Sequence, residues 1–297
     1  MSTWAFTKMH GLGNDYITID GIERSVDFDP AVAARQLSRR GFSIGADGLV
    51  LILPGEAGGD FRMRIFNADG SEARMCGNAS RCVGKYLYER GRTNKTLIRL
   101  ETNSGVKELR LHLAGDESRV AQVGVDMGEP VFSLARVPAD LPGEEWIEKK
   151  VKYGGFSERA TVLSMGNPHV VFRTDAMLSE LELSEYGQAM VACGYFPEGV
   201  NTEVLQVHDR QTLAMRVWER GSGETLACGS GACAAVVAAI RNGWVERGVP
   251  VTVRLRGGDL CICWQYDGRV IMVGDAAFSY EGTVEIDTIS LAQERNL

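Results

Sequence analysis

An internal repeat constrains the fold of this chain more than any other feature of the sequence. The stretches FNADGSEARMCGN (66–78) and WERGSGETLACGS (218–230) each place a Glu four residues before a Cys-Gly pair. Cys228 follows Cys76 by 152 residues, and the match extends without gaps over 64–82 and 216–234. A self-similar period of this length indicates a duplicated unit. We therefore expect two copies of one fold in a single chain.

Two further matches support the duplication. HGLGNDYITID (10–20) resembles LSMGNPHVVFR (163–173), and TNSGVKELRLHL (102–113) resembles RLRGGDLCICWQ (254–265). The three matches occur in the same order at nearly one offset, and 297 residues suit two domains of ordinary size. We expect an N-terminal half at 1–128, with 279–297 crossing back to it, and a C-terminal half at 129–278.

Most of each half is strand-like, which predicts an α/β (α+β) fold dominated by sheet. Short alternating or β-branched runs bounded by Gly and Asn predict strands in the first half at Ala5–Asp20, Gly48–Leu53, Phe61–Phe66, Leu97–Thr102, Lys107–Leu113 and Val120–Val125. Capping and stop signals predict helices at Pro30–Arg40, Ala79–Arg90, Leu183–Cys193 and Gly231–Arg241. The last contains ACAAVVAAI, which is apolar on every side and therefore predicts a buried central helix.

Charge and hydropathy argue against nucleic-acid and membrane partners. The net charge is −7 and no basic stripe or zinc-finger spacing occurs. The longest apolar runs, Gly48–Leu53 and Ala232–Ile240, fall short of the ~20 residues that cross a bilayer. The N-terminal sequence has no apolar signal core. We therefore expect a cytoplasmic protein with a small-molecule substrate.

The seven cysteines do not predict a disulfide framework, because their number is odd and no secretory signal accompanies them. Cys82 and Cys233 fall inside predicted helices, where core packing is the favoured interpretation. Cys261 and Cys263 alternate in LCICW and share one face, which we expect to be buried. The four histidines are scattered, so we expect no metal site.

Cys76 and Cys228 each stand just before the first turn of a predicted helix. The positive end of the helix dipole stabilises a thiolate, so we expect both thiols to have lowered pKa values. Two such thiols on opposite sides of one anion suit the inversion of a stereocentre beside a carboxylate, since one removes the proton and the other returns it. No motif for a pyridoxal or dinucleotide cofactor occurs, so this chemistry would be cofactor-free. The backbone N–H groups that could cradle the carboxylate belong to Gly77, Asn78, Gly229 and Ser230.

Other residues near the repeats have two interpretations each. Asn67 in the first copy corresponds to Glu219 in the second, and Arg220 follows Glu219 in a Gly-rich loop. This asymmetry suits a substrate with two different ends, with Arg220 as a fork for a second carboxylate, whereas the alternative is a surface ion pair. His169 could tune a thiol or be structural. A single cysteine before a helix is more often core than catalyst, and duplication could also copy a structural cysteine.

Five stretches together resemble the diaminopimelate epimerase family: KMHGLGNDY (8–16), FNADGSEARMCGN (66–78), GNPH (166–169), GVNTE (199–203) and WERGSGETLACGSGA (218–232). The resemblance covers nearly the whole chain in the family's order. It implies two pseudo-symmetric domains, each a mostly antiparallel curled sheet around a central helix, with the active site between them. It also implies a homodimer that interconverts LL- and meso-2,6-diaminoheptanedioate without a cofactor, in lysine and peptidoglycan-precursor biosynthesis.

By this resemblance, Cys76 and Cys228 are the acid–base pair, with Cys228 accepting the proton from the LL isomer, and His169 and Glu219 support the thiols. The resemblance implies that the substrate is held, largely at its distal end, by Asn14, Asn67, Asn167, Asn201, Glu219 and Arg220. Gly77-Asn78 and Gly229-Ser230 would hold the reacting carboxylate. The chain departs from the family at Gly48, where Gln is frequent, and at Ala79-Ser80, where Gly-Ala is frequent.

Two other functions remain open from the sequence. One is a sibling racemase that uses the same paired thiols on another amino acid, such as a proline-type substrate. The other is a redox or binding protein whose two cysteines form a reversible disulfide. Glu219-Arg220 and the several Asn residues favour a substrate with two carboxylates and two amines.

Overall fold

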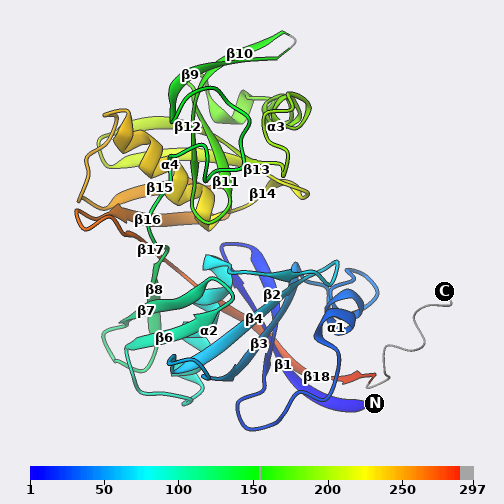
Figure 1. Ribbon diagram of the computed structural model, residues 1–297. Helices are drawn as coiled ribbons and strands as arrows, with labels where there is room; N and C mark the ends of the chain where they lie inside the picture. The colour runs from blue at the N-terminus through cyan, green and yellow to red at the C-terminus, as the bar shows by residue number, and fades with distance from the viewer. Residues whose placement is uncertain (154, 288–297) are drawn as a thin grey trace, which may run out of the picture. The chain divides into compact units, whose positions relative to one another are not determined.

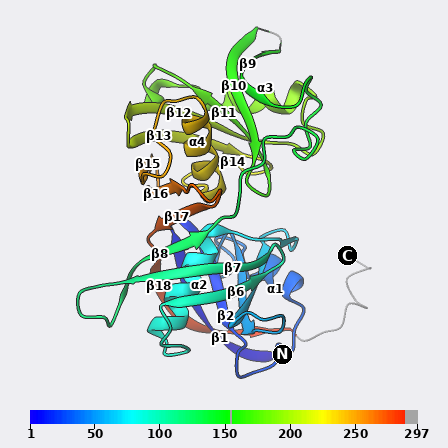
Figure 2. The same cartoon turned by 60° about the vertical axis from the view of Figure 1, so that its left-hand side comes forward.

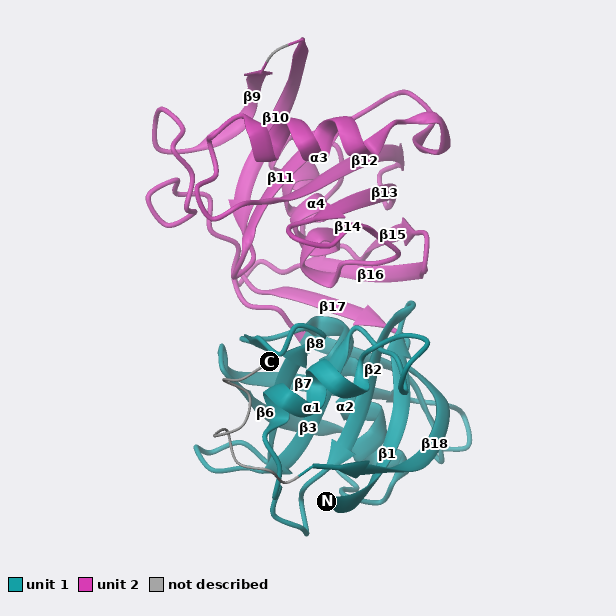
Figure 3. Cartoon of the chain, turned by 90° about the vertical axis from the view of Figure 1, so that its right-hand side faces the viewer, with its two compact units in different colours: residues 1–125, 275–297 teal, residues 126–274 magenta. Residues whose placement is uncertain are grey.

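The computed structural model describes residues 1–153 and 155–287, and these form two compact units. Unit 1 contains residues 1–125 together with the chain from 275 onward, and unit 2 contains residues 126–274 (Figure 3). The segment expected to cross back, 279–297, begins within a strand of unit 1, and its residues 288–297 lie outside the described part of the chain.

Unit 1 is built from strands with two helices among them. Its elements are β1 (Ser2–Gly11), β2 (Asn14–Asp20), α1 (Pro30–Leu37), β3 (Gly48–Pro54), β4 (Phe61–Asn67), β5 (Glu72–Ala73), α2 (Gly77–Glu89), β6 (Leu97–Thr102), β7 (Gly105–Leu113), β8 (Val120–Asp126) and β18 (Ala277–Ile286).

Unit 2 repeats this order. Its elements are β9 (Trp146–Tyr153), β10 (Phe156–Ser164), β11 (Pro168–Arg173), the 3₁₀ turn η1 (Leu178–Glu180), α3 (Leu183–Ala192), β12 (Asn201–Asp209), β13 (Thr212–Glu219), β14 (Gly223–Thr225), α4 (Gly229–Arg241), β15 (Val251–Leu255), β16 (Gly258–Trp264) and β17 (Val270–Gly274).

The strand pairings of the two units correspond one to one. In unit 1, β1 pairs antiparallel with β2, β2 runs parallel to β3 across α1, and β4 runs parallel to β6 across α2. In unit 2, β10 pairs antiparallel with β11, β11 runs parallel to β12 across α3, and β13 runs parallel to β15 across α4. The other strand pairs within each unit are antiparallel, as hairpin connections allow. The predicted α+β fold of two pseudo-symmetric, mostly antiparallel units is confirmed.

Each unit surrounds one helix with its strands. Helix α2 packs against β1, β4 and β7, and it lies among the strands of unit 1 in Figure 1. Helix α4 packs against all of β10–β13 and β15–β17, and it lies among the strands of unit 2 in Figure 2. The prediction of a buried central helix after Cys228 is confirmed, since every residue from Gly231 to Ala239 is buried. No helix in the described part of the chain is long and apolar enough to cross a membrane.

The local signals predicted most element boundaries. Asp29 caps α1 by accepting hydrogen bonds from the N–H groups of Ala31 and Val32. The expected strand Ala5–Asp20 is instead two strands joined by a tight turn, in which Leu12 and Gly13 have φ of 57° and 86°. The Gly in this turn supplies backbone freedom that a side chain would oppose.

The prediction that Cys261 and Cys263 are buried is wrong. Both side chains are half-buried, whereas the alternate residues Leu260, Ile262 and Trp264 face the core. Alternation identifies two faces of a strand but does not say which one packs inward when both carry apolar side chains. Cys82 and Cys233 are fully buried in α2 and α4, as predicted.

Candidate active site

Each predicted catalytic cysteine is the residue that precedes the first turn of a central helix. Cys76 occupies the N-cap of α2 and Cys228 the N-cap of α4, and both have extended backbone conformations. The carbonyl of each cysteine accepts the first backbone hydrogen bond of its helix. Ser80 N–H donates to Cys76 O and Ala232 N–H donates to Cys228 O, both at 2.9 Å. The side chains nevertheless have different surroundings.

The thiol of Cys76 lies in a cluster of neutral polar groups. Its Sγ is 3.1 Å from the hydroxyl of Tyr16 and 3.7 Å from Oδ1 of Asn14. Asn78 Nδ2 donates to the same Asn14 oxygen at 3.1 Å. The structure therefore brings three predicted site residues, Asn14, Cys76 and Asn78, into one hydrogen-bonded group.

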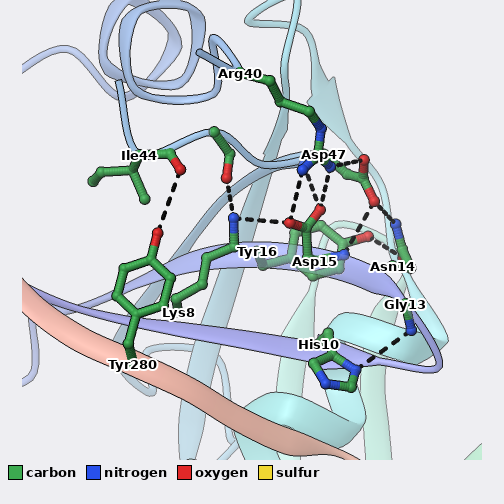
Figure 4. A network of polar contacts seen from close by, with 11 residues as sticks. Lys8, His10, Gly13, Asn14, Asp15, Tyr16, Arg40, Ile44, Asp47 and Tyr280 are labelled. Carbon is green, nitrogen blue, oxygen red and sulfur yellow. Dashed lines mark hydrogen bonds and ion pairs between the residues drawn. The ribbon is translucent and has the colours of Figure 1, made fainter. Parts of the chain in front are cut away.

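A charged network behind Asn14 fixes the orientation of its amide (Figure 4). Asn14 Nδ2 donates to Asp47 Oδ2 at 2.7 Å, and Arg40 donates to the other oxygen of Asp47 at 2.9 Å. Asp15 shares Arg40 and also pairs with Lys8 at 2.8 Å, and these two cations lower the pKa of Asp15 despite its partial burial. A carboxylate at Asp47 only accepts, so the amide nitrogen of Asn14 must face it and the amide oxygen must face the thiol.

The thiol of Cys228 lies among carboxyl groups. Its Sγ accepts from the N–H of Gly231 at 3.4 Å and lies 3.5 Å from the hydroxyl of Ser230. The thiol also contacts the carboxyl of Glu219, which accepts from the Thr225 hydroxyl at 2.5 Å. Burial, reinforced by the charges of Glu219 and Glu203, raises the pKa of the Cys228 thiol well above its ordinary value. The expectation of a lowered pKa at Cys228 is therefore wrong, because desolvation exceeds the effect of the helix N-terminus.

His169 holds polar groups beside the Cys228 thiol. It is fully buried in β11, with Nδ1 2.7 Å from Glu203 Oε1 and Nε2 3.0 Å from Asn167 Oδ1. Glu203 in turn lies against the first turn of α4, since a Cβ added at Gly231 would approach Glu203 Oε1 to 2.7 Å. His169 thus reaches the thiol through Glu203.

The remaining predicted side chains sit at strand ends and turns. Asn201 Oδ1 accepts from the backbone N–H of Arg220 at 2.9 Å, and Arg220 itself is exposed and donates to Glu198 O at 2.7 Å. Asn67 is exposed at the end of β4 and donates to the hydroxyl of Ser71 at 2.9 Å. Asn67 and Glu219 close equivalent strands, β4 and β13, as the repeat predicts.

The predicted carboxylate cradles are the first residues of the two central helices. Gly77 and Asn78 begin α2, and Gly229 and Ser230 begin α4. N–H groups in the first turn of a helix lack intrahelical acceptors and attract anions. Ala79 and Ser80, which stand where the family frequently has Gly-Ala, both lie within α2. The Ser80 hydroxyl donates to Cys76 O at 2.9 Å.

Gly48 lies where a side chain has no room. It pairs with Tyr16 in β2 and with Asn67 in β4, and a Cβ there would come within 2.3 Å of Phe66 O. The equivalent pairing in unit 2 joins His169 to Asn201. Unit 2 therefore has the polar side chain of Asn201 at the position where unit 1 has Gly48, which has no side chain.

Sequence reasoning assigned no role to four residues that contact the site, namely Tyr16, Asp47, Glu203 and Thr225. Tyr16, Glu203 and Thr225 lie within the motifs given above, and Tyr16 aligns with His169 in the repeat. That alignment could have identified Tyr16. The sequence carries no comparable signal for Asp47, because its contact with Asn14 depends on the parallel pairing of β2 and β3.

Comparison with known proteins identifies the family. The family model described as diaminopimelate epimerase matches residues 6–133 and 161–279. The chain belongs to the diaminopimelate epimerase family. A diaminopimelate epimerase of Acetivibrio thermocellus is 47% identical over 285 residues, covering 96% of this chain and 99% of the relative. One of Methanococcus maripaludis is 43% identical over 282 residues, covering 95% and 99%.

Solved structures with low sequence identity share the fold of this family. A hydroxyproline epimerase from Agrobacterium vitis matches with a TM-score of 0.68 at 14% identity, over 98% of this chain and 93% of that one. A probable proline racemase from Agrobacterium radiobacter matches with a TM-score of 0.70 at 15% identity, over 97% and 94%. These likenesses extend over both units.

Proposed function

We propose that this protein interconverts LL- and meso-2,6-diaminoheptanedioate without a cofactor, with Cys76 and Cys228 as the two bases. The observation that carries the proposal is the pair of thiols at equivalent helix N-termini of two equivalent units, in a chain of the diaminopimelate epimerase family. Membership of the family supports the substrate. The repeated helix start supports the chemistry.

In the direction from LL to meso, the thiolate of Cys228 takes the α-proton and the thiol of Cys76 delivers a proton to the opposite face. The electron pair left by the C–H bond spreads onto the adjacent carboxylate and returns to form the new C–H bond. Helix N–H groups at Gly77 and Gly229 stabilise that transient charge. The reaction ends with Cys228 protonated and Cys76 as thiolate, and the reverse reaction uses this second form.

Glu219 exchanges a proton with Cys228 in this scheme. Burial raises the pKa of Glu219, and its carboxyl contacts the thiol. A carboxyl group with a raised pKa beside a thiol with a raised pKa keeps one proton available to the pair. His169 holds Glu203 and Asn167 in place beside them.

The distal end of the substrate carries a second amine and a second carboxylate. We assign its binding to the Arg220 guanidinium, the Glu219 carboxyl and the amides of Asn14, Asn67, Asn167 and Asn201. Arg220 is exposed and anchored through Glu198 O, which leaves a planar fork suited to a carboxylate. Protein groups orient the Asn14 amide at both ends, since its nitrogen donates to Asp47 and its oxygen accepts from Asn78.

A racemase of another amino acid is the alternative that the fold alone allows, since the structural relatives include proteins described as hydroxyproline epimerase and proline racemase. The test is incubation of the protein with separate amino acids in heavy water. We expect α-deuterium in diaminopimelate and none above background in proline or hydroxyproline. Exchange into another amino acid without exchange into diaminopimelate would replace the proposal with the sibling activity.

We also propose that the protein works in the cytoplasm as a homodimer, and that the two cysteines do not form a disulfide during turnover. The family resemblance supports the dimer. Light scattering on the purified protein tests the mass, with twice 32.4 kDa expected. Full activity in the presence of a thiol reductant tests the second point, and loss of activity on reduction would favour a redox function.

A further inference from the structure

The side chain of Tyr16 lies between a thiol and an amide oxygen. Its hydroxyl is 3.1 Å from Cys76 Sγ and 2.7 Å from Asn14 Oδ1, and the residue is only 5% exposed. A phenol hydroxyl has one proton to donate. Tyr16 can therefore donate to either neighbour, but not fully to both.

The orientation of Asn14 decides what the second neighbour is. Its Nδ2 is committed to Asp47, whose other oxygen is held by Arg40. Its Oδ1 therefore points to Tyr16, and it also accepts from Asn78 Nδ2. Because Asn78 supplies a second donor, Asn14 Oδ1 remains hydrogen-bonded when the Tyr16 proton turns away from it.

The preferred direction of the Tyr16 proton depends on the protonation state of Cys76. A thiol can donate its own proton to the Tyr16 oxygen or to Asn14 Oδ1, and the Tyr16 hydroxyl then donates to Asn14. A thiolate only accepts, so the best arrangement turns the Tyr16 O–H toward sulfur. Rotation about one C–O bond makes the change without moving a heavy atom. Hydrogen bonds to charged acceptors are stronger than those to neutral ones.

We propose that Tyr16 is a positioning residue that donates a hydrogen bond to the thiolate of Cys76 and turns to Asn14 when Cys76 holds the proton. The inference rests on the proposed role of Cys76 as one of the two bases. It gives the half-site of unit 1, the group around Cys76, its own means of stabilising a thiolate; the half-site of unit 2 is the group around Cys228. The second half-site has His169 at the aligned position, and that ring contacts Asn167 and Glu203.

The other titratable groups around Tyr16 do not provide this stabilisation. Asp47 and Cys82 are the further groups that act on the hydroxyl. Asp47 is paired with Arg40, and its negative charge would oppose a thiolate. Burial raises the pKa of Cys82 to about 12, so that thiol is neutral at pH 7. Burial and the nearby Cys76 sulfur raise the pKa of Tyr16 itself, which keeps its hydroxyl a donor.

The test is the pH dependence of alkylation of Cys76 by iodoacetamide, read peptide by peptide by mass spectrometry. The reagent reacts with thiolate, so the rate reports the thiolate fraction without any substrate. In Tyr16→Phe we expect the rate profile of Cys76 to move to higher pH, with alkylation at pH 7 about tenfold slower. An unchanged Cys76 profile in a folded Tyr16→Phe protein would overturn the proposal.

Tyr86→Phe is the matched control. Tyr86 is a buried tyrosine of the same unit whose hydroxyl donates to Asp20 at 3.2 Å, away from the thiol. We expect its Cys76 profile to equal that of the unaltered protein. An equal shift in both variants would mean that the hydroxyl of Tyr16 acts only through general packing, and would overturn the specific role.

A second variant retains the hydroxyl and the ring. Replacement of Tyr16 by 2,3-difluorotyrosine makes the phenol a stronger donor with little change of shape. We expect the Cys76 profile to move in the opposite direction, to lower pH. Movement to higher pH, or none, would contradict donation to the thiolate. Because alkylation needs no turnover, these results are independent of whether the protein epimerises diaminopimelate.

Kinetics then separate positioning from substrate binding. If epimerisation is found, Tyr16→Phe should lower kcat by about tenfold and leave KM within about twofold, because the phenol acts on the base and not on the substrate. A rise in KM with unchanged kcat would assign Tyr16 to the support of Asn14 as a binding group and would overturn the proposal.

Discussion

Cys76 and Cys228 begin equivalent helices in equivalent units, yet their thiols have opposite environments. Cys76 is half-buried beside the hydroxyl of Tyr16 and the amide of Asn14. Cys228 is buried, caps its own helix through Gly231 N–H and contacts the carboxyl of Glu219. Duplication therefore preserved the backbone geometry of the site while the side chains around each sulfur diverged.

The difference suits a reaction in which the two thiols must be in different protonation states. Burial, together with the charges of Glu219 and Glu203, favours the protonated thiol at Cys228, whereas Cys76 lies beside a hydroxyl that we infer donates to its thiolate. A symmetric site would leave the two protonation states equal in energy. The following predictions test this asymmetry, in order of expected effect.

Replacement of either thiol should have the largest effect. We expect Cys76→Ser and Cys228→Ser each to lower the rate of epimerisation by at least about 10³-fold, because a serine hydroxyl is a far weaker acid than a thiol and does not ionise near pH 7 to supply the base. Circular dichroism should show an unchanged fold. Cys82→Ser is unsuitable as a control because Cys82 is buried in α2, so Cys261→Ser, on a half-buried strand face, serves instead. Near-full activity in either thiol variant would contradict the two-base mechanism.

Removal of the charge beside Cys228 should have an intermediate effect. We expect Glu219→Gln to lower kcat by about 10- to 100-fold and to speed alkylation of Cys228 at pH 7, because the carboxylate that raises the pKa of this thiol is gone. The control is Glu224→Gln in the same hairpin, since Glu224 pairs with Arg216 instead. Equal effects of the two variants would indicate general disturbance of the hairpin.

Gly48, whose counterpart in unit 2 is Asn201, should affect stability. We expect Gly48→Ala to lower the free energy of unfolding by about 1–3 kcal/mol, because its Cβ would meet Phe66 O. Urea denaturation measures the change. Gly115→Ala, where a Cβ meets nothing within 4 Å, should change stability little. A neutral Gly48→Ala variant would show that β3 and β4 separate easily at this point.

The smallest effect concerns stability and pH. Burial raises the pKa of Glu219 above its ordinary 4.5, so its contribution to stability is fully present below pH 4.5 and is lost as the pH rises through the raised value. Arg216 lowers the pKa of Glu224, so that carboxylate contributes above pH 4.5 and loses its contribution as the pH falls. As the pH rises from 4 to 8, the melting temperature of Glu219→Gln should therefore increase relative to that of the unaltered protein. The melting temperature of Glu224→Gln should decrease relative to it. The same trend in both variants would contradict this account.

The sequence predicted the parts of this molecule that repeat or have local signals. Three aligned stretches predicted two equivalent units, and Asp29 and the Ala-rich run after Cys228 predicted α1 and α4. The sequence also placed Cys76 and Cys228 before their helices. These features depend on residues close together in the chain.

Features that depend on burial and on contacts across strands were missed or wrong. The raised pKa of Cys228 follows from its burial, to which the charges of Glu219 and Glu203 on separate strands add. The contact of Tyr16 with Cys76 spans 60 residues. The inward face of β16 depends on what covers each side, so alternation alone assigned Cys261 to the wrong side.

The most direct test of two thiols acting on opposite faces of the substrate is the distribution of solvent deuterium between substrate and product at low conversion. In heavy water, two bases acting on opposite faces should give meso product that carries α-deuterium while the remaining LL substrate keeps its α-proton, since the thiol that removes a proton is not the one that delivers the solvent deuteron. Chiral chromatography with mass spectrometry resolves both isomers. Product that retains the substrate's proton would indicate a single base and would contradict the account.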